Sequence, residues 1–227
     1  MKLQARNISK TYFRKKGNSN YFYAVQPCDF DLEEDMLTVL MGHSGSGKTT
    51  LMSLLSGLLL PDSGTVTVDG QNLYAMKDGA LSAFRAAHLA VAPQGRAALD
   101  TLSVLENTLL NARLLRRETQ ETLSKAWGWL ERFGLKALMD ARPRELSGGE
   151  LRRMTLCRAL VTEPEILFCD EPTGDLDEEN TKLVLESLRD YAHTGHSVLL
   201  VTHEAEAASC ADRLLKMKEG LWEASEQ

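Results

Sequence analysis

The feature that most constrains this chain of 227 residues is the glycine-rich loop Gly42–Thr50, with the sequence Gly-His-Ser-Gly-Ser-Gly-Lys-Thr-Thr. The loop follows the short apolar segment Leu37–Met41 and leads into a segment with helical periodicity, Lys48–Leu59. A strand, a loop of the pattern G-x-x-x-x-G-K-[ST] and a helix, in that order, favour phosphate binding. The glycines allow successive backbone N–H groups to face one anion, and the helix N-terminus adds partial positive charge. The sequence therefore predicts a nucleotide phosphate at this loop rather than a flexible Gly/Ser turn.

A second candidate feature is the apolar segment Ile166–Cys169, which runs directly into Asp170 and Glu171. A buried strand in a parallel sheet would deliver Asp170 to the carboxyl edge, where ligands of such sheets gather. We expect Asp170 to hold Mg²⁺ through a water and Glu171 to act as general base on the attacking water. An apolar strand that ends in Asp-Glu is weak evidence alone, and the phosphate loop upstream favours the catalytic interpretation.

The segment Leu146–Glu150, Leu-Ser-Gly-Gly-Glu, predicts the start of a helix that runs to about Leu160. Its glycines would expose backbone donors at a positive helix end, which makes a second anion site. The alternative is an ordinary N-cap, because Ser147 and Glu150 have the spacing of a capping box. The position of the segment favours the anion site, since Ser147 lies 99 residues after Lys48 and 23 residues before Asp170.

In this order and spacing, the motifs resemble those of the nucleotide-binding subunit of ABC transporters, over nearly the whole chain. Leu146–Glu150 is similar to the family's signature segment, which the resemblance expects to act in trans on the nucleotide of a second cassette. Further positions match the family pattern in chain order: Tyr12, or in its place Phe13, as the aromatic that stacks on adenine, Gln94 as the Q-loop glutamine, Asp177 at the end of the D-loop Gly174–Asp177, and His203 as the switch histidine.

The motifs and the resemblance together predict ATP and Mg²⁺ as ligands and five groups of site residues. The ATP-binding residues would be Tyr12, Gly42, His43, Ser44, Gly45, Ser46, Gly47, Lys48, Thr49, Thr50 and Gln94. Those for catalysis would be Lys48, Glu171 and His203, and those for magnesium Thr49, Gln94 and Asp170. The signature residues Ser147, Gly148, Gly149 and Glu150 would act in trans, and Asp177 would be the D-loop residue.

The fold expected from these observations is α/β: a P-loop NTPase core with a mostly parallel sheet, an N-terminal antiparallel β-subdomain and an inserted α-helical subdomain. We expect one ABC ATPase domain over residues 1–227. About residues 1–94 and 161–227 would form the RecA-like core with the antiparallel β-subdomain, and about residues 95–160 the helical subdomain with the signature. Turn signals fall at residues 17–20 and at Asp69-Gly70, and a helix is expected near Glu178–Ala192.

Side-chain patterns also predict what is buried. Apolar stripes at helical spacing predict core at Leu102, Leu105, Leu109 and Leu110, and at Leu123, Trp127, Leu130 and Phe133. The scattered cysteines Cys28, Cys157, Cys169 and Cys210 have no metal-ligand spacing and suit a reducing cytoplasm, with Cys157 and Cys169 expected in the core. A basic group at Arg113, Arg116 and Arg117 is typical of a solvated helix face.

Charge and hydropathy limit the partners. The net charge of −6 gives no broad basic surface for nucleic acid. The N-terminus lacks the apolar core of a secretion signal, and the longest apolar stretch, Leu51–Leu60, is about half of a membrane span. The resemblance implies a second ABC ATPase domain, identical or a paralogue, and an integral-membrane permease. It places the chain peripherally at the cytoplasmic face of the plasma (inner) membrane.

The run Asp170–Asp177 is similar to the D-E-P-T-G-x-L-D run of ATPases in macrolide-export, lipoprotein-release and antimicrobial-peptide-resistance systems. The first hypothesis is therefore the ATP-hydrolysing subunit of a membrane exporter or extractor. The alternative is a regulatory ABC ATPase that acts on a membrane partner without moving solute. A third class, soluble ABC machines, usually carries a long coiled-coil insertion or a second cassette, and neither is visible here. Glu150 stands where the family usually has glutamine, and we expect it to tune the rate rather than abolish it.

Overall fold

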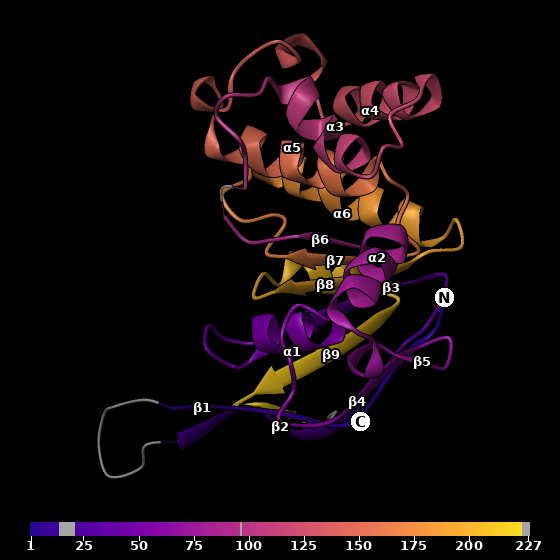
Figure 1. Cartoon of the computed structure of the whole chain (residues 1–227). Helices are drawn as coiled ribbons and strands as arrows, with labels where there is room; N and C mark the ends of the chain where they lie inside the picture. Colours follow the sequence, from indigo (N-terminus) through magenta and orange to yellow (C-terminus); the bar gives the residue numbers. More distant parts are fainter. Residues whose placement is uncertain (14–20, 96, 224–227) are drawn as a thin grey trace.

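The computed structural model describes residues 1–13, 21–95 and 97–223 (Figure 1). The strands in chain order are β1 (Leu3–Phe13), β2 (Tyr21–Leu32), β3 (Met36–Met41), β4 (Ser63–Val68), β5 (Gln71–Asn72), β6 (Leu89–Ala92), β7 (Ile166–Asp170), β8 (Ser197–Thr202), β9 (Arg213–Lys218) and β10 (Leu221–Trp222). The α-helices are α1 (Lys48–Leu55), α2 (Asp78–His88), α3 (Val104–Leu114), α4 (Gln120–Arg132), α5 (Gly148–Leu160), α6 (Glu178–Ala192) and α7 (Glu206–Cys210). Short 3₁₀ turns occupy Leu73–Ala75, Lys136–Leu138 and Pro143–Glu145.

Within the described ranges the strands form two sheets. The smaller sheet has the order β2-β1-β4-β5 and is antiparallel throughout. The larger has the order β10-β9-β3-β8-β7-β6, and its neighbouring strands are parallel except for the β9-β10 pair. This arrangement confirms the predicted α/β fold with a mostly parallel sheet and an antiparallel N-terminal sheet. Figure 1 shows α3, α4 and α5 at one end of the molecule and the β1-β2 hairpin at the opposite end.

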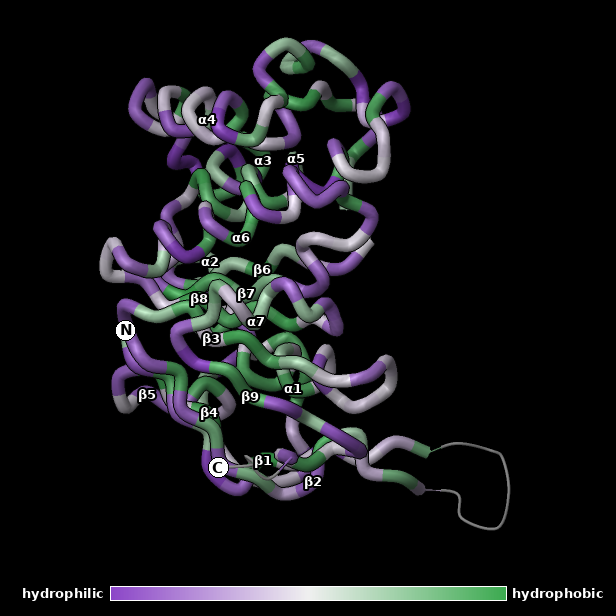
Figure 2. Tube along the Cα trace, turned by 180° about the vertical axis from the view of Figure 1, so that it is seen from behind, coloured by the Kyte–Doolittle hydropathy of each residue, from purple (hydrophilic) through white to green (hydrophobic). Residues whose placement is uncertain are grey.

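The central strands of the larger sheet are buried on both faces, and their alternation divides the core in two. Leu40, Phe168 and Val201 belong to a cluster that also holds residues of α1 and of the antiparallel sheet. Cys169 and Leu200, which neighbour Phe168 and Val201 in sequence, belong to a cluster with α5 and α6 on the other face. The same strands form a continuous apolar band in Figure 2. Because both faces of this sheet are covered, polar side chains and ligands are expected at the carboxyl ends of its strands.

Two expectations about helices are corrected. α1 ends at Leu55 rather than at Leu59, because Gly57 takes a left-handed φ of 69° and turns the chain away, which leaves Leu58 exposed. Trp127 is 43% exposed and not part of the core. The buried stripe of α4 instead runs through Ala126 and Leu130 toward Phe133, and a small alanine gives a weaker apolar signal than its tryptophan neighbour.

Other expectations are confirmed. The hairpin after β4 turns at Asp69-Gly70, and α6 spans Glu178–Ala192. Cys157 and Cys169 are fully buried. Arg113 pairs with Glu118 on an exposed surface (Nε–Oε2 2.9 Å), as a solvated face requires. The predicted turn at residues 17–20 lies outside the described residues. None of the helices in the described ranges combines the length and hydropathy that a membrane span requires.

Candidate ATP site

The phosphate loop joins β3 to α1 at the carboxyl edge of the larger sheet. Gly47 precedes α1 with a φ of 104°, and a Cβ there would lie 2.0 Å from the Ala24 carbonyl oxygen. Only glycine satisfies both conditions, because other residues rarely adopt this φ and have no room for a side chain. At Gly42 a Cβ would lie 2.3 Å from the Met217 carbonyl oxygen. The loop is therefore pressed against neighbouring backbone and held in one shape.

Lys48 is the first residue of α1, and its side chain turns back over the loop. Its Nζ donates to the carbonyl oxygens of Gly42 (2.6 Å) and His43 (3.0 Å). Lys48 is 6% exposed, and burial lowers its pKa, while the charges of Glu171 and Asp170 oppose that shift. The ammonium is thus held within the loop, partly desolvated, where a phosphate oxygen would be a stronger partner than a carbonyl.

Asp170 and Glu171 follow β7 at the same edge. The Thr49 hydroxyl donates to Asp170 Oδ1 (3.3 Å), which joins the phosphate loop to the end of β7. Asp170 is 3% exposed, and burial raises its pKa. A buried carboxylate next to a hydroxyl at a sheet edge is an arrangement that a bound cation would stabilise.

Both carboxylate oxygens of Glu171 have partners from β8 and the residue after it. The Thr202 hydroxyl donates to Oε2 (3.0 Å), and His203 Nδ1 donates to Oε1 (2.8 Å). The hydrogen bond to Glu171, followed by its negative charge, raises the pKa of His203. Thr202 is fully buried, so the hydroxyl fixes one side of the carboxylate while the exposed histidine can move on the other.

A cleft of about 360 Å³ brings most of the predicted nucleotide residues together. Its lining includes Tyr12, Ser44, Gly45, Ser46, Gly47, Lys48, Thr49, Thr50, Gln94, Glu171 and His203. Gly42 and His43 line an adjoining cavity of about 200 Å³ that also reaches His203. Asp170 lies beneath the cleft, in contact with Thr49. The Ser46 hydroxyl is buried, and the described residues offer it no hydrogen-bond partner.

Two lining residues were missed by sequence reasoning. Phe22 lies opposite Tyr12 across β1 and β2, with ring centroids 6.1 Å apart, and both line the cleft. Ala24, two residues further along β2, also lines it. The period-2 alternation from Phe22 to Ala24 was the available signal. Phe13, the other aromatic considered for the base, pairs with Tyr21 (5.3 Å between centroids) and does not line the cleft.

The sequence matches the family model described as ABC transporter over residues 25–174. The chain belongs to the ABC transporter family. This cassette is 36% identical over 219 residues to the ABC transporter ATP-binding protein YxdL of Bacillus subtilis, which covers 96% of this chain and 84% of the relative. It is 37% identical over 224 residues to the lipoprotein-releasing system ATP-binding protein LolD of Psychrobacter arcticus, which covers 97% of each.

The cassette's fold is also similar to that of a solved structure, the dimeric ATP-binding cassette MJ0796 in a post-hydrolysis state bound to ADP and Pi. The TM-score is 0.89 with 28% sequence identity, covering 98% of this chain and 97% of that chain. Together with the family match, this likeness identifies the cassette as an ATPase that binds and hydrolyses ATP.

The signature segment of the cassette leads into the start of α5, and none of its residues lines the cleft in the described part of the same chain. Ser147 is the N-cap of α5 and forms a reciprocal capping box with Glu150. The Glu150 Oε2 accepts from the Ser147 N–H (2.7 Å) and from the Ser147 hydroxyl (2.8 Å). These bonds, the one to the backbone first, lower the pKa of Glu150. Asp177 likewise caps α6 by accepting from the Asn180 N–H (2.8 Å).

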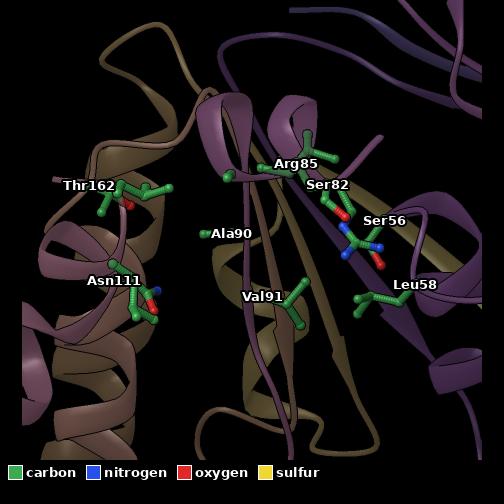
Figure 3. Close-up of a pocket in the computed structure, with 12 residues that line it drawn as sticks. Ser56, Leu58, Ser82, Arg85, Ala90, Val91, Asn111 and Thr162 are labelled. Atoms are coloured by element: carbon green, nitrogen blue, oxygen red, sulfur yellow. The ribbon is translucent and has the colours of Figure 1, made fainter. Parts of the chain in front are cut away.

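The cassette has a second cleft, of about 380 Å³, beside β6 (Figure 3). It lies between α2 and β6 on one side and α3 on the other, and Figure 3 shows Leu58, Arg85, Val91 and Asn111 around it. Its lining is mostly apolar, from residues such as Leu58, Leu89, Ala90, Val91, Leu114 and Leu115. No phosphate-loop residue lines it.

Proposed function

We propose that the cassette hydrolyses Mg-ATP in a composite site, half of which is its own cleft and half the signature segment of a second cassette. The observation that carries the proposal is the convergence of the phosphate loop, Gln94, Glu171 and His203 on one cleft. A triphosphate keeps negative charge that one loop does not fully neutralise. The N-terminus of α5 from the second cassette would supply the remaining donors through Ser147 and Gly149. The likeness to a dimeric cassette supports this pairing.

Within the cleft each side chain has a proposed task. Tyr12, with Phe22 beside it, would stack on the adenine ring. Lys48 would leave the loop carbonyls and donate to the β- and γ-phosphates. Glu171 would take a proton from the attacking water, held in place by Thr202 and His203. All three partners of the reaction, the phosphate, the water and the base, would then meet at the carboxyl edge of the larger sheet.

The residues present fit a magnesium ion. Thr49 and Asp170 already lie within hydrogen-bond distance, and Gln94 lines the same cleft. The ranges that the structure describes contain no group of three or more His, Cys, Asp or Glu able to hold a metal by itself. That composition suits Mg²⁺, which proteins hold by one or two side chains together with substrate phosphates. When bound, the ion would neutralise charge on the phosphates.

Replacing Glu171 by glutamine tests the proposed base. Glu171→Gln keeps the size and one acceptor oxygen but removes the basic group, so we expect turnover to fall by roughly 10²- to 10⁴-fold. ATP affinity should persist, and ATP-bound dimers should accumulate. Phosphate release by the purified chain and size-exclusion chromatography with ATP measure the two effects. Unchanged hydrolysis would remove Glu171 from this role.

We further propose that the cassette powers a membrane exporter or extractor, bound peripherally at the cytoplasmic face of the plasma (inner) membrane. A permease segment in the apolar cleft of Figure 3 would contact β6 directly before Gln94, and so would sense the nucleotide cleft. The relative LolD is named for lipoprotein release, which supports an extractor. The alternative, a regulatory cassette without solute transport, would use the same cleft.

Purification of the complex separates these alternatives. The membrane protein that co-purifies with the cassette is reconstituted in vesicles with ATP. ATP-dependent movement of a lipid-linked or hydrophobic substrate supports the exporter or extractor. ATP hydrolysis that changes the partner's conformation but moves no substrate supports the regulatory alternative. Purification with nucleic acid instead of a membrane protein would contradict both.

A further inference from the structure

We infer that Arg152 is a positioning residue that ties the general base Glu171 to helix α5, and therefore to the signature segment. The inference rests on the proposed function of Glu171 and of that segment. Arg152 lies on α5, five residues after the N-cap Ser147. Its guanidinium crosses from the helix to the turn that follows β7, where Nη1 donates to the Glu171 carbonyl oxygen.

The turn after β7 is one that needs support. Glu171 and Asp175 both have left-handed backbones, with φ of 50° and 65°, although neither is glycine. Such conformations persist where surrounding contacts hold them, and they gather at functional sites. Arg152 contacts both ends of this turn, through the Glu171 carbonyl and through a 3.4 Å ion pair with Asp175 Oδ2.

Gly174 leaves the space that the guanidinium occupies. A Cβ on Gly174 would lie 2.9 Å from Arg152 Nη1 and 3.3 Å from its Cζ. The φ of Gly174 is not among the positive values, so the backbone does not require glycine here, and a Cβ at this position would displace the end of the Arg152 side chain. The ion pair adds little by itself, because the Asp175 side chain is 80% exposed. The bond to the Glu171 carbonyl is the specific part of the contact.

This contact joins the two halves of the proposed composite sites within one chain. The signature segment of a chain would contact the partner's nucleotide, whereas its Glu171 would act on its own. A displacement of α5 when the signature meets phosphate would reach Glu171 through a short path, along the start of α5 and then through the Arg152 side chain. Arg152 would therefore couple the two ATP sites of the dimer.

The test compares Arg152→Ala with Arg153→Ala, a matched variant on the same helix. Arg153 Nε donates to the Phe133 carbonyl oxygen (3.0 Å) and not to the turn after β7. We expect Arg152→Ala to lower kcat by about 10- to 100-fold, as misplacement of a catalytic group does. ATP affinity should stay within about twofold, and the Hill coefficient for ATP should fall toward one. Arg152→Lys, which keeps the charge and a donor, should recover part of kcat.

A double-mutant cycle isolates the contact from a general loss of stability. Gly174→Ala should lower kcat in the wild-type chain, where the new methyl group meets the guanidinium. It should add little to Arg152→Ala, where the space is free. Additive effects, or an equal loss of kcat in Arg153→Ala, would overturn the inference. If Arg152→Ala does not fold, as judged by thermal unfolding, Arg152→Lys and Gly174→Ala still decide it: unchanged kcat in both would overturn it.

Glu171→Gln in the same assay separates this inference from the proposed function. If that variant keeps full turnover, the assignment of the base has failed. If it loses turnover while Arg152→Ala does not, the base stands and only the role of Arg152 is lost.

Discussion

Two helices of this cassette begin at glycine-rich segments, and their N-termini are completed in opposite ways. α1 follows Gly47, which supplies no side-chain cap, and its first turn contains no acidic residue. α5 follows Ser147, whose hydroxyl accepts from the Glu150 N–H (3.3 Å) while the Glu150 carboxylate accepts from the Ser147 N–H (2.7 Å). One helix end is open toward a cleft, and the other is closed by its own side chains.

This difference shows what each half of the site requires. At α1 the first backbone N–H groups lack a side-chain partner and face the cleft with Lys48, so a phosphate would satisfy groups that the fold leaves open. At α5 the same needs are met within the chain, so a phosphate must replace bonds that already exist. This difference fits the proposed function, in which one chain binds the nucleotide and a second chain seals it.

Removal of Lys48 should give the largest effect on the open end. Lys48 is the only lysine or arginine of the loop Gly42–Thr50 and lines the cleft, so we expect Lys48→Ala to lower ATP affinity by about 100-fold or more. Equilibrium binding of a fluorescent ATP analogue measures it. Lys182→Ala, on the exposed face of α6, is the control and should bind ATP as the wild type does. Tight ATP binding by Lys48→Ala would contradict the view that the open N-terminus of α1, with Lys48, is the phosphate site.

Ser147→Ala tests the closed end. The loss of an N-cap should lower the free energy of unfolding by about 1 kcal/mol. It should also lower turnover by about tenfold, since a donor to the phosphate in trans is lost. ATP binding by the single chain should not change. Urea denaturation and steady-state ATPase assays measure the two effects.

The structure offers a matched control in α3. Ser103 caps that helix through the same capping box with Glu106, away from the cleft. Ser103→Ala should lose similar stability and keep its turnover. Equal losses of turnover in the two variants would mean that Ser147 acts only as a cap.

Much of this contrast could be predicted from the sequence, because the motifs are local. The strand-loop-helix order around Lys48 and the capping-box spacing of Ser147 and Glu150 depend on neighbouring residues, and both are present in the structure. Contacts between distant segments could not be predicted in the same way. Phe22 reaches the cleft only because β2 pairs with β1. Asn107, fully buried, accepts from Arg158 Nη2 (2.6 Å), and no periodicity shows that a polar residue will fill that interior position.

Glu150→Gln sharpens the comparison with a smaller change. The glutamine oxygen can still accept from the Ser147 N–H, but the negative charge near the incoming phosphate is removed. Charges at a helix N-terminus contribute about 0.3–1 kcal/mol, so turnover at low salt should rise by a few-fold at most. High salt should reduce the difference between the variant and the wild type. Glu106→Gln in α3 is the control, and a similar rise there would show that the effect is not specific to the signature.

The smallest expected effect is a difference in pH dependence between the ATP cleft, through His203, and the capping box of α5, through Glu150. The pKa of His203 is raised above its ordinary 6.5 by Glu171. The stabilisation from this pair is therefore complete below pH 6.5 and is lost as the pH rises through the higher folded value. Glu150 has a lowered pKa, so its contribution is complete above 4.5 and is lost only as the pH falls through the lower folded value. As the pH rises above 6.5, the contribution of the His203–Glu171 pair should therefore change while that of Glu150 stays constant.

Urea denaturation of the wild type and of His203→Gln across this range measures the response of the cleft. Because His203 is largely exposed, we expect the difference in unfolding free energy between the two proteins to change by about 0.5 kcal/mol or less. Subtracting the variant removes every pH-dependent contribution that the two proteins share. A difference that stays constant with pH would mean that the His203–Glu171 pair does not persist in solution. Among the described residues, the Glu171 carboxylate would then keep only Thr202 as a partner before ATP binds. The cleft would in that case leave more of its polar groups without partners than the capping box of α5 does.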